Sequence, residues 1–180
     1  MNRRERIQML VTLRRVEGGP RRTQFLLIHR IDRALAEHPH EPDLLLLKGH
    51  VLDRLGEYQA ARRLYTLAVR RDGANVLAAM DIGHSYYYAG RMALALRWYD
   101  RAIALLRAGH SWAVWRAEWE EAHWFRAWSL AEMGRRAAAI ACCRHGLARA
   151  PRSHSLLDLL GTLQGISIAN PGRRPEAKRR

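Results

Sequence analysis

The chain has 180 residues, of which 48% are hydrophobic, and a formal net charge of +14. This length favours one domain with a real core, and no apolar run reaches the roughly 18 residues that a membrane-spanning helix needs. The N-terminal segment lacks the apolar stretch of a signal peptide. Cys142 and Cys143 are adjacent, so a disulfide between them would be strained. We therefore expect a protein of the reducing cytoplasm.

The first 41 residues predict two helices, at residues 3–16 and at RRTQFLLIHRIDRALAEHP, residues 21–39. Shifting the chain by 34 residues aligns the second of these with a better-formed segment further on. Residues 1–41 are therefore predicted to be a degenerate copy of the unit that follows.

Residues 42–109 contain one pattern twice, in copies 42–75 and 76–109. Each copy predicts two helices separated by a glycine that makes the turn. Small residues recur where the two helices must cross closely, and larger apolar residues recur beside that crossing. The matched pairs are Gly49 with Gly83, Leu52 with Tyr86, Gly56 with Gly90, Ala61 with Ala95, Tyr65 with Tyr99, and Ala68 with Ala102. One such unit cannot bury its apolar face alone, so the copies are expected to stack.

A looser third copy at 120–153 follows an insertion at 110–119, which we expect to lengthen a helix. Residues 154–166 repeat only the first helix of a unit and predict a capping helix. Residues 167–180 are expected to be a basic, flexible tail, because from Pro171 onward the chain has proline, glycine and charge but nothing apolar to bury.

This pattern resembles the tetratricopeptide repeat (TPR) family. The resemblance implies an all-α fold, a right-handed superhelix (α-solenoid) of three helix-turn-helix repeats between the degenerate N-terminal repeat and the capping helix. The aromatic residue of the second helix, Tyr65 or Tyr99, is expected to pack against the next unit. Lys48 and Arg126 stand where the family favours leucine, so different local packing is expected there.

The resemblance also implies that the first helix of each repeat lines a concave groove in which an extended peptide binds. Tyr86 is expected in the core rather than in this groove. The residues at groove positions include Leu46, His50, Asp53, Asp81, His84, Tyr87, Tyr88, Glu121, Trp124, Phe125 and Trp128. This aromatic and mildly acidic set disfavours a carboxylate clamp and favours a neutral or basic segment with apolar side chains. Alternatively, these aromatic residues seal joints between helices.

Three tryptophans in and next to the insertion, Trp112, Trp115 and Trp119, share one helical stripe that His123 continues. Two interpretations are open. A lengthened first helix packs its stripe on a lengthened second helix around Leu105 and Leu106, or the tryptophans form an exposed second contact patch for a partner or another copy of the chain.

No motif of a catalytic site is present: there is no glycine-rich phosphate loop, HExxH, GxSxG or paired CxxC. Cys142 and His145 share a helix face, but two ligands do not make a zinc site. We therefore expect neither an enzyme nor a bound cofactor or metal. His50 and His84 occupy equivalent groove positions and could make binding sensitive to pH.

The predicted function is a non-enzymatic module or scaffold that binds a protein or peptide segment in the groove. The alternative is an arginine-rich accessory protein that binds nucleic acid through its ends, because residues 1–22 carry a net charge of +5 and residues 169–180 carry +4. No membrane contact is expected, and self-association is left open.

Overall fold

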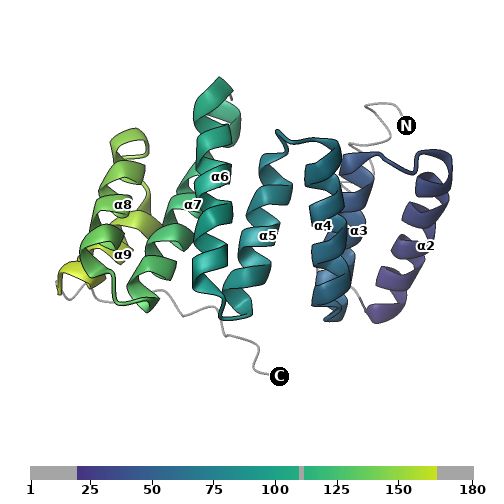
Figure 1. The fold of residues 1–180 in the computed structure, drawn as a ribbon, viewed down its shortest axis with the longest axis horizontal. Helices are drawn as coiled ribbons and strands as arrows, with labels where there is room; N and C mark the ends of the chain where they lie inside the picture. Colours follow the sequence, from purple (N-terminus) through teal and green to yellow (C-terminus); the bar gives the residue numbers. More distant parts are fainter. Residues whose placement is uncertain (1–19, 110–111, 166–180) are drawn as a thin grey trace. The chain divides into compact units, whose positions relative to one another are not determined.

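The computed structural model describes residues 20–109 and 112–165. Within these ranges the chain forms eight helices and no strand (Figure 1). It divides into two compact units, residues 1–78 and 79–180, rather than the single one that the length favours. The helices are α2 (Arg21–Glu37), α3 (Pro42–Leu55), α4 (Tyr58–Arg71), α5 (Val76–Tyr88), α6 (Met92–Gly109), α7 (Trp112–Glu132), α8 (Arg136–Arg149) and α9 (His154–Gln164).

Each helix pair is joined by the same tight turn, built on a glycine. Gly56, which ends α3, has a φ of 90°, a left-handed conformation that costs a glycine little. The Glu57 N–H then donates to the Leu52 carbonyl at 2.9 Å, which satisfies one of the last carbonyls of the helix. The turns at Gly90 and Gly134 have the same hydrogen bond, from Arg91 to Tyr86 and from Arg135 to Leu130.

The two helices of a pair approach closely because a glycine lies under an aromatic ring. A Cβ atom on Gly49 would lie 2.3 Å from the Tyr65 ring, and one on Gly83 would lie 2.7 Å from the Tyr99 ring. In the third pair of helices, α7 and α8, alanine replaces the glycine and cysteine replaces the tyrosine. These residues, Ala127 and Cys143, are both fully buried. A larger residue on the first helix is therefore matched by a smaller one on the second.

The two basic residues in place of the family's leucine form ion pairs with the preceding helix. Lys48 Nζ on α3 lies 2.7 Å from Asp32 Oδ1 on α2. Arg126 on α7 pairs with Asp100 on α6. Asp32 and Asp100 occupy the same position in their repeats, so the same pairing of a basic residue with an aspartate of the preceding helix occurs twice.

Each unit has its own hydrophobic core. In the first unit, α2 packs on α3 through a cluster that contains Leu27, Ile31, Leu44, Leu47 and Val51. In the second unit, α9 packs on both α7 and α8. The cluster there contains Leu96, Ala127, Leu130, Ala139, Cys142, Cys143 and Leu159.

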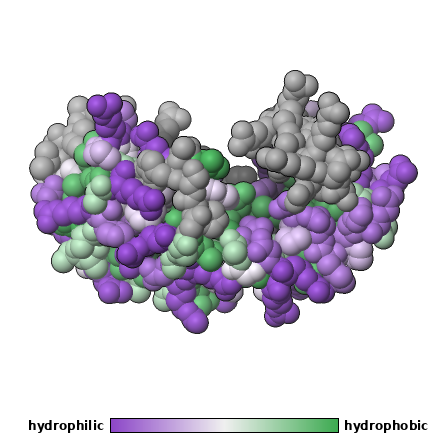
Figure 2. Space-filling view, turned by 90° about the horizontal axis from the view of Figure 1, so that it is seen from above, coloured by the Kyte–Doolittle hydropathy of each residue, from purple (hydrophilic) through white to green (hydrophobic). Residues whose placement is uncertain are grey.

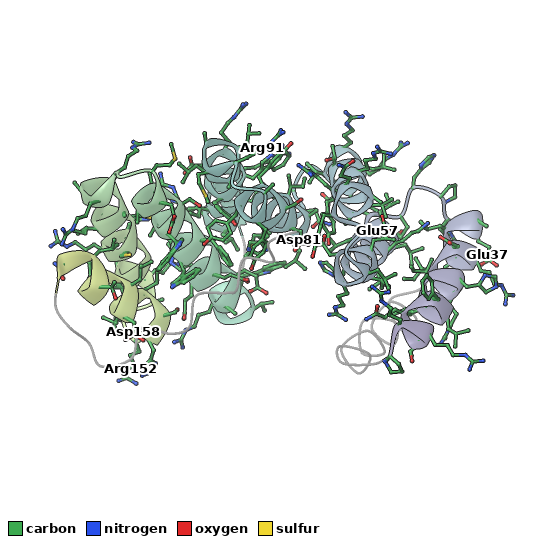
Figure 3. The ribbon with its side chains drawn as sticks, turned by 90° about the horizontal axis from the view of Figure 1, so that it is seen from below. Glu37, Glu57, Asp81, Arg91, Arg152 and Asp158 are labelled. Carbon is green, nitrogen blue, oxygen red and sulfur yellow. The ribbon has the colours of Figure 1, made fainter. Side chains whose placement is uncertain are left out.

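Figure 2 shows one face on which hydrophilic residues predominate and hydrophobic ones are scattered among them. Glu37, Arg91 and Arg152 point outward from their helices or turns (Figure 3). Across the described part of the chain, no helix has the length and apolar character to cross a membrane. The predicted helix at 3–16 and the predicted tail lie outside the described residues.

Candidate peptide-binding site

The aromatic residues of α5 and α7 gather around Phe125 in the second unit. Its ring centroid lies 5.3 Å from that of Tyr87, 6.4 Å from that of Tyr88 and 4.9 Å from that of Trp124, each contact edge to face. The fourth neighbour is Tyr99 of α6, which stacks on Phe125 at 5.7 Å. Such edge-to-face pairs are favourable geometries for aromatic rings. Phe125 is therefore the centre of the predicted groove residues in this unit, which we call the Phe125 cluster.

Two carboxylates flank a histidine at the edge of the Phe125 cluster. His84 Nδ1 lies 3.8 Å from Asp81 Oδ1 on the same helix, and Nε2 lies 3.7 Å from Glu121 Oε1 on α7. The His84 ring also contacts Phe125, with centroids 4.4 Å apart. At these distances the carboxylates approach the imidazole without a hydrogen bond. The cluster is therefore apolar at its centre and acidic on one side.

The Tyr99 hydroxyl, beneath Phe125, differs from its counterpart in the first unit. In that unit, the Tyr65 hydroxyl donates to Asp53 Oδ2 at 2.9 Å. The residue equivalent to Asp53 in the next repeat is Tyr87, which has no carboxylate. The buried Tyr99 hydroxyl accordingly has no hydrogen-bond partner among the described residues. Burial also raises the pKa of Tyr99 far above its ordinary value, so the hydroxyl keeps its proton and remains a donor.

Trp124 and Trp128 extend the Phe125 cluster along α7. Their rings stack with centroids 5.4 Å apart and planes within 14°. Both rings also pack against the core cluster of the second unit, and both are partly buried. These tryptophans therefore pack against neighbouring helices and keep part of their surface exposed, which leaves both interpretations of the sequence open.

The predicted groove residues of the first unit have different surroundings. Leu46 is only 5% exposed, which corrects its prediction as a ligand contact. Leu44 to Leu47 are four consecutive buried residues, and such a run needs packing partners on more than one side of α3. His50 and Asp53 are partly buried and both contact Tyr65, through a ring contact at 5.6 Å and the hydrogen bond above.

Within the tyrosine triplet, Tyr88 is the exposed member. Tyr88 is 51% exposed, whereas Tyr86 and Tyr87 are partly buried. The prediction of Tyr86 as a core residue is therefore too strong. Its position explains the difference, because α5 ends two residues later and the residues that follow are exposed.

The predicted second contact patch does not include Trp119. This side chain is 3% exposed, and its indole N–H donates to the Gly146 carbonyl at 3.1 Å. Trp119 is therefore buried against α8, whereas the first interpretation of the stripe places it on α6, the helix that contains Leu105 and Leu106. Trp115 is partly buried at a kink in α7, with φ −110° and ψ 17°. Trp112 is the first residue of α7, and its side chain lies outside the described part of the structure.

The structure also pairs two histidines that sequence reasoning did not connect. His123 Nε2 lies 3.0 Å from His145 Nδ1, and both rings contact Trp119. The shared face of Cys142 and His145 was visible in the sequence, but the register of α8 against α7 that brings His123 to them was not. Among the described residues no group of three or more potential ligands could hold a metal ion.

A family model described as tetratricopeptide repeat matches residues 28–75 and 46–110. The matched part of the chain, residues 28–110, belongs to the tetratricopeptide repeat family. No curated protein matches its sequence.

Solved structures extend the likeness of this TPR protein beyond the matched residues. MamA residues 41 to the end, from Desulfovibrio magneticus RS-1, is 14% identical with a TM-score of 0.69, covering 92% of this chain and 86% of that one. The first TPR domain of Spaghetti (RPAP3), bound to the HSP90 peptide SRMEEVD, is 18% identical with a TM-score of 0.60, covering 69% and 91%. YrrB, a TPR protein with an unusual peptide-binding site, is 12% identical with a TM-score of 0.61, covering 74% and 63%. At these identities the likeness shows the fold, an all-α TPR solenoid.

Proposed function

We propose that this TPR protein is a non-enzymatic interaction module and that the Phe125 cluster binds a peptide or protein segment. The observation that carries the proposal is the gathering of Tyr87, Tyr88 and Trp124 around one phenylalanine, with Tyr88 51% exposed. Two of the similar structures are of peptide-binding proteins. The first TPR domain of Spaghetti (RPAP3) is bound to an HSP90 peptide, and YrrB has an unusual peptide-binding site. Rigid aromatic side chains supply contact area at a low entropic cost.

The chemistry of the cluster favours a segment with an apolar or aromatic residue next to a basic one. Asp81 and Glu121 place two carboxylates beside the aromatic surface. A lysine or arginine of the partner would be attracted by these carboxylates and by the faces of the exposed rings. An acidic C-terminal peptide is disfavoured for the same electrostatic reason.

Selection from a displayed random-peptide library on the immobilised full-length chain tests this function. We expect the selected peptides to contain arginine or lysine beside an apolar residue. Replacing Tyr88 or Trp124 by alanine should weaken binding of the selected peptide by about tenfold or more, as for a central aromatic contact. Trp98→Ala is the matched control, because this tryptophan of α6 contacts Arg101 and lies outside the cluster. Equal binding by wild-type protein, Tyr88→Ala and Trp124→Ala would contradict the proposal.

The alternative function, binding of nucleic acid, rests on charge. The seven arginines of residues 1–22 and the five basic residues of 169–180 fall almost entirely outside the described residues. Arginine-rich segments neutralise phosphates without sequence preference, and that binding depends strongly on salt.

A further inference from the structure

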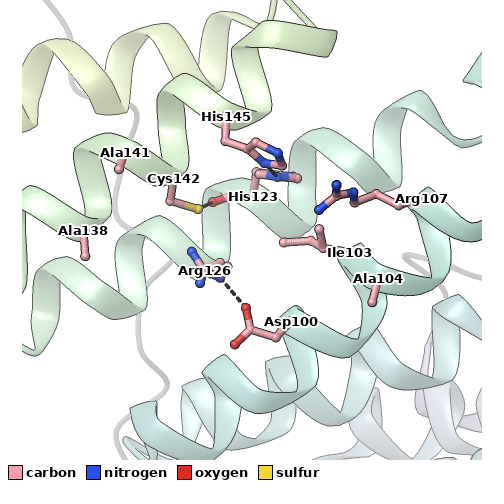
Figure 4. A pocket seen from close by; sticks show the side chains of 10 residues that line it. All are labelled: Asp100, Ile103, Ala104, Arg107, His123, Arg126, Ala138, Ala141, Cys142 and His145. Carbon is pink, nitrogen blue, oxygen red and sulfur yellow. Dashed lines mark hydrogen bonds and ion pairs between the residues drawn. The ribbon is translucent and has the colours of Figure 1, made fainter.

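A second recess lies between α6, α7 and α8, apart from the Phe125 cluster. Its volume is about 470 Å³, and its polar lining consists of Asp100, Arg107, His123, Arg126, Cys142 and His145 (Figure 4). Successive residues of an α-helix are rotated by about 100°. His123 therefore lies on nearly the opposite face of α7 from Phe125, and the recess is separate from the proposed peptide site.

Two differences from the other repeats create the space and its charge. Ala141 of α8 stands where the equivalent residues of α4 and α6 are Arg63 and Arg97, so a methyl group replaces a long side chain. In addition, α6 has 18 residues whereas α4 has 14, and Arg107 belongs to the added turn. The lengthened helix thus adds a guanidinium beside a wall of short side chains.

The two arginines of the recess differ in whether an acidic side chain neutralises them. The guanidinium of Arg126 is held by Asp100, which neutralises its charge. Arg107 is exposed, and no partner for it is seen among the described residues. Its guanidinium points toward the histidine pair (Figure 4). The recess therefore has one uncompensated positive charge, on a group whose planar fork matches a carboxylate or a phosphate.

The histidine pair supplies a fixed wall. His123 Nδ1 lies 2.9 Å from the Trp119 carbonyl, which can only accept, so Nδ1 carries the proton. His123 Nε2 then accepts from His145 Nδ1. Burial lowers the pKa of His123 to about 4, so this imidazole is uncharged at neutral pH. Burial also raises the pKa of the Cys142 thiol, which is therefore no thiolate.

We propose that this recess binds the oxyanion of a small organic ligand, with Arg107 as the principal contact. The volume accommodates a small molecule rather than a peptide. The walls combine Ile103, Ala104, Ala138 and Ala141 with the polar groups above, which is the usual composition of a small-molecule site.

Two simple anions, inorganic phosphate and succinate, are suitable probes. Each is titrated into the full-length chain at constant ionic strength, with chloride as the replaced anion, and binding is followed by NMR chemical shifts. We expect saturable shifts at residues of α6, α7 and α8 that line the recess. A response to phosphate alone assigns the site to phosphorylated ligands, and a response to succinate alone assigns it to carboxylates. The absence of a saturable response to either anion overturns the proposal.

Three variants locate the binding. Arg107→Gln removes the charge at an exposed position and should weaken anion binding about tenfold or more. Ala141→Leu keeps the charges and fills the space, and should weaken it similarly. Arg97→Gln removes one charge from an exposed position on the same helix and should leave anion binding unchanged. Equal weakening in Arg97→Gln and Arg107→Gln would mean that the response reflects only net charge, which also overturns the proposal.

Discussion

Gly83 of α5 and Tyr99 of α6 fill one space between their helices, so the size of each residue limits the size of the other. The ring is fully buried, and it lies where a Cβ atom on residue 83 would be. The same pair occurs 34 residues earlier as Gly49 and Tyr65. The repeat pattern predicted that the ring contacts the next repeat, and the stacking of Tyr99 on Phe125 confirms that contact. The close approach of ring and glycine within one repeat was not predicted, since spacing alone does not give the distance between two helices.

We expect Gly83→Ala to destabilise the protein by about 1–3 kcal/mol, the usual cost of overpacking a core. In an open helical position the same change would stabilise, because alanine favours helix by about 1 kcal/mol over glycine. The sign of the effect therefore reports the contact with Tyr99. Chemical denaturation of wild type and variant measures it, and a more stable variant would show that the ring moves aside without cost.

Burial of individual site residues was harder to predict than their position along a helix. The repeat register placed Leu46 and Tyr86 on defined faces, yet Leu46 is buried and Tyr86 is partly exposed. A face is a property of one helix, whereas burial depends on everything packed around it. The environment of the Tyr99 hydroxyl was equally hard to predict. It has no acceptor among the described residues because Tyr87 stands where the preceding repeat has Asp53.

The lengthened helices α6 and α7 are the main departure from the simple repeat. The tryptophan spacing predicted one helical stripe, but α7 has a kink at Trp115, and Trp119 faces α8. His123 and His145 continue the same contact between α7 and α8. Their pairing could not be predicted, because 22 residues separate them and the register between two helices is set by packing of the whole interface.

This contact should make stability depend on pH. His123 has a pKa of about 4 in the folded chain, lowered mainly by burial, against about 6.5 when unfolded. Between these values the unfolded chain binds more protons, so stability is full above about pH 6.5 and falls as the pH decreases toward 4. The expected contribution is up to about 3 kcal/mol.

Denaturation at about pH 7.5 and about pH 4.5 compares wild type with two variants. His123→Gln should lose less stability on acidification than wild type, because no buried imidazole needs to be protonated. His154→Gln, at an exposed position, should behave like wild type. If all three lose the same stability, His123 is not the group that titrates.

At the scale of the whole molecule, the charge distribution separates the two candidate functions. Residues 23–168 hold 19 basic and 14 acidic residues, so much of the net charge of +14 lies in the ends. The Phe125 cluster, by contrast, has Asp81 and Glu121 beside its rings. The affinity for a peptide that buries apolar area on this cluster depends weakly on salt concentration. The affinity of arginines for phosphates, by contrast, decreases steeply as the salt concentration rises.

Removing residues 171–180 takes away five basic residues and no part of the Phe125 cluster. The truncated chain should therefore bind a selected peptide as tightly as the full chain, at low and high salt alike. Its affinity for an oligonucleotide of arbitrary sequence should fall, and the slope of that affinity against salt should decrease by about 0.7–0.9 for each phosphate that the tail no longer neutralises. Fluorescence anisotropy with labelled peptide and labelled oligonucleotide measures both. Loss of peptide binding in the truncated chain, with Tyr88→Ala silent, would assign binding to the tail and refute the role of the cluster, because the two features differ in both position and charge.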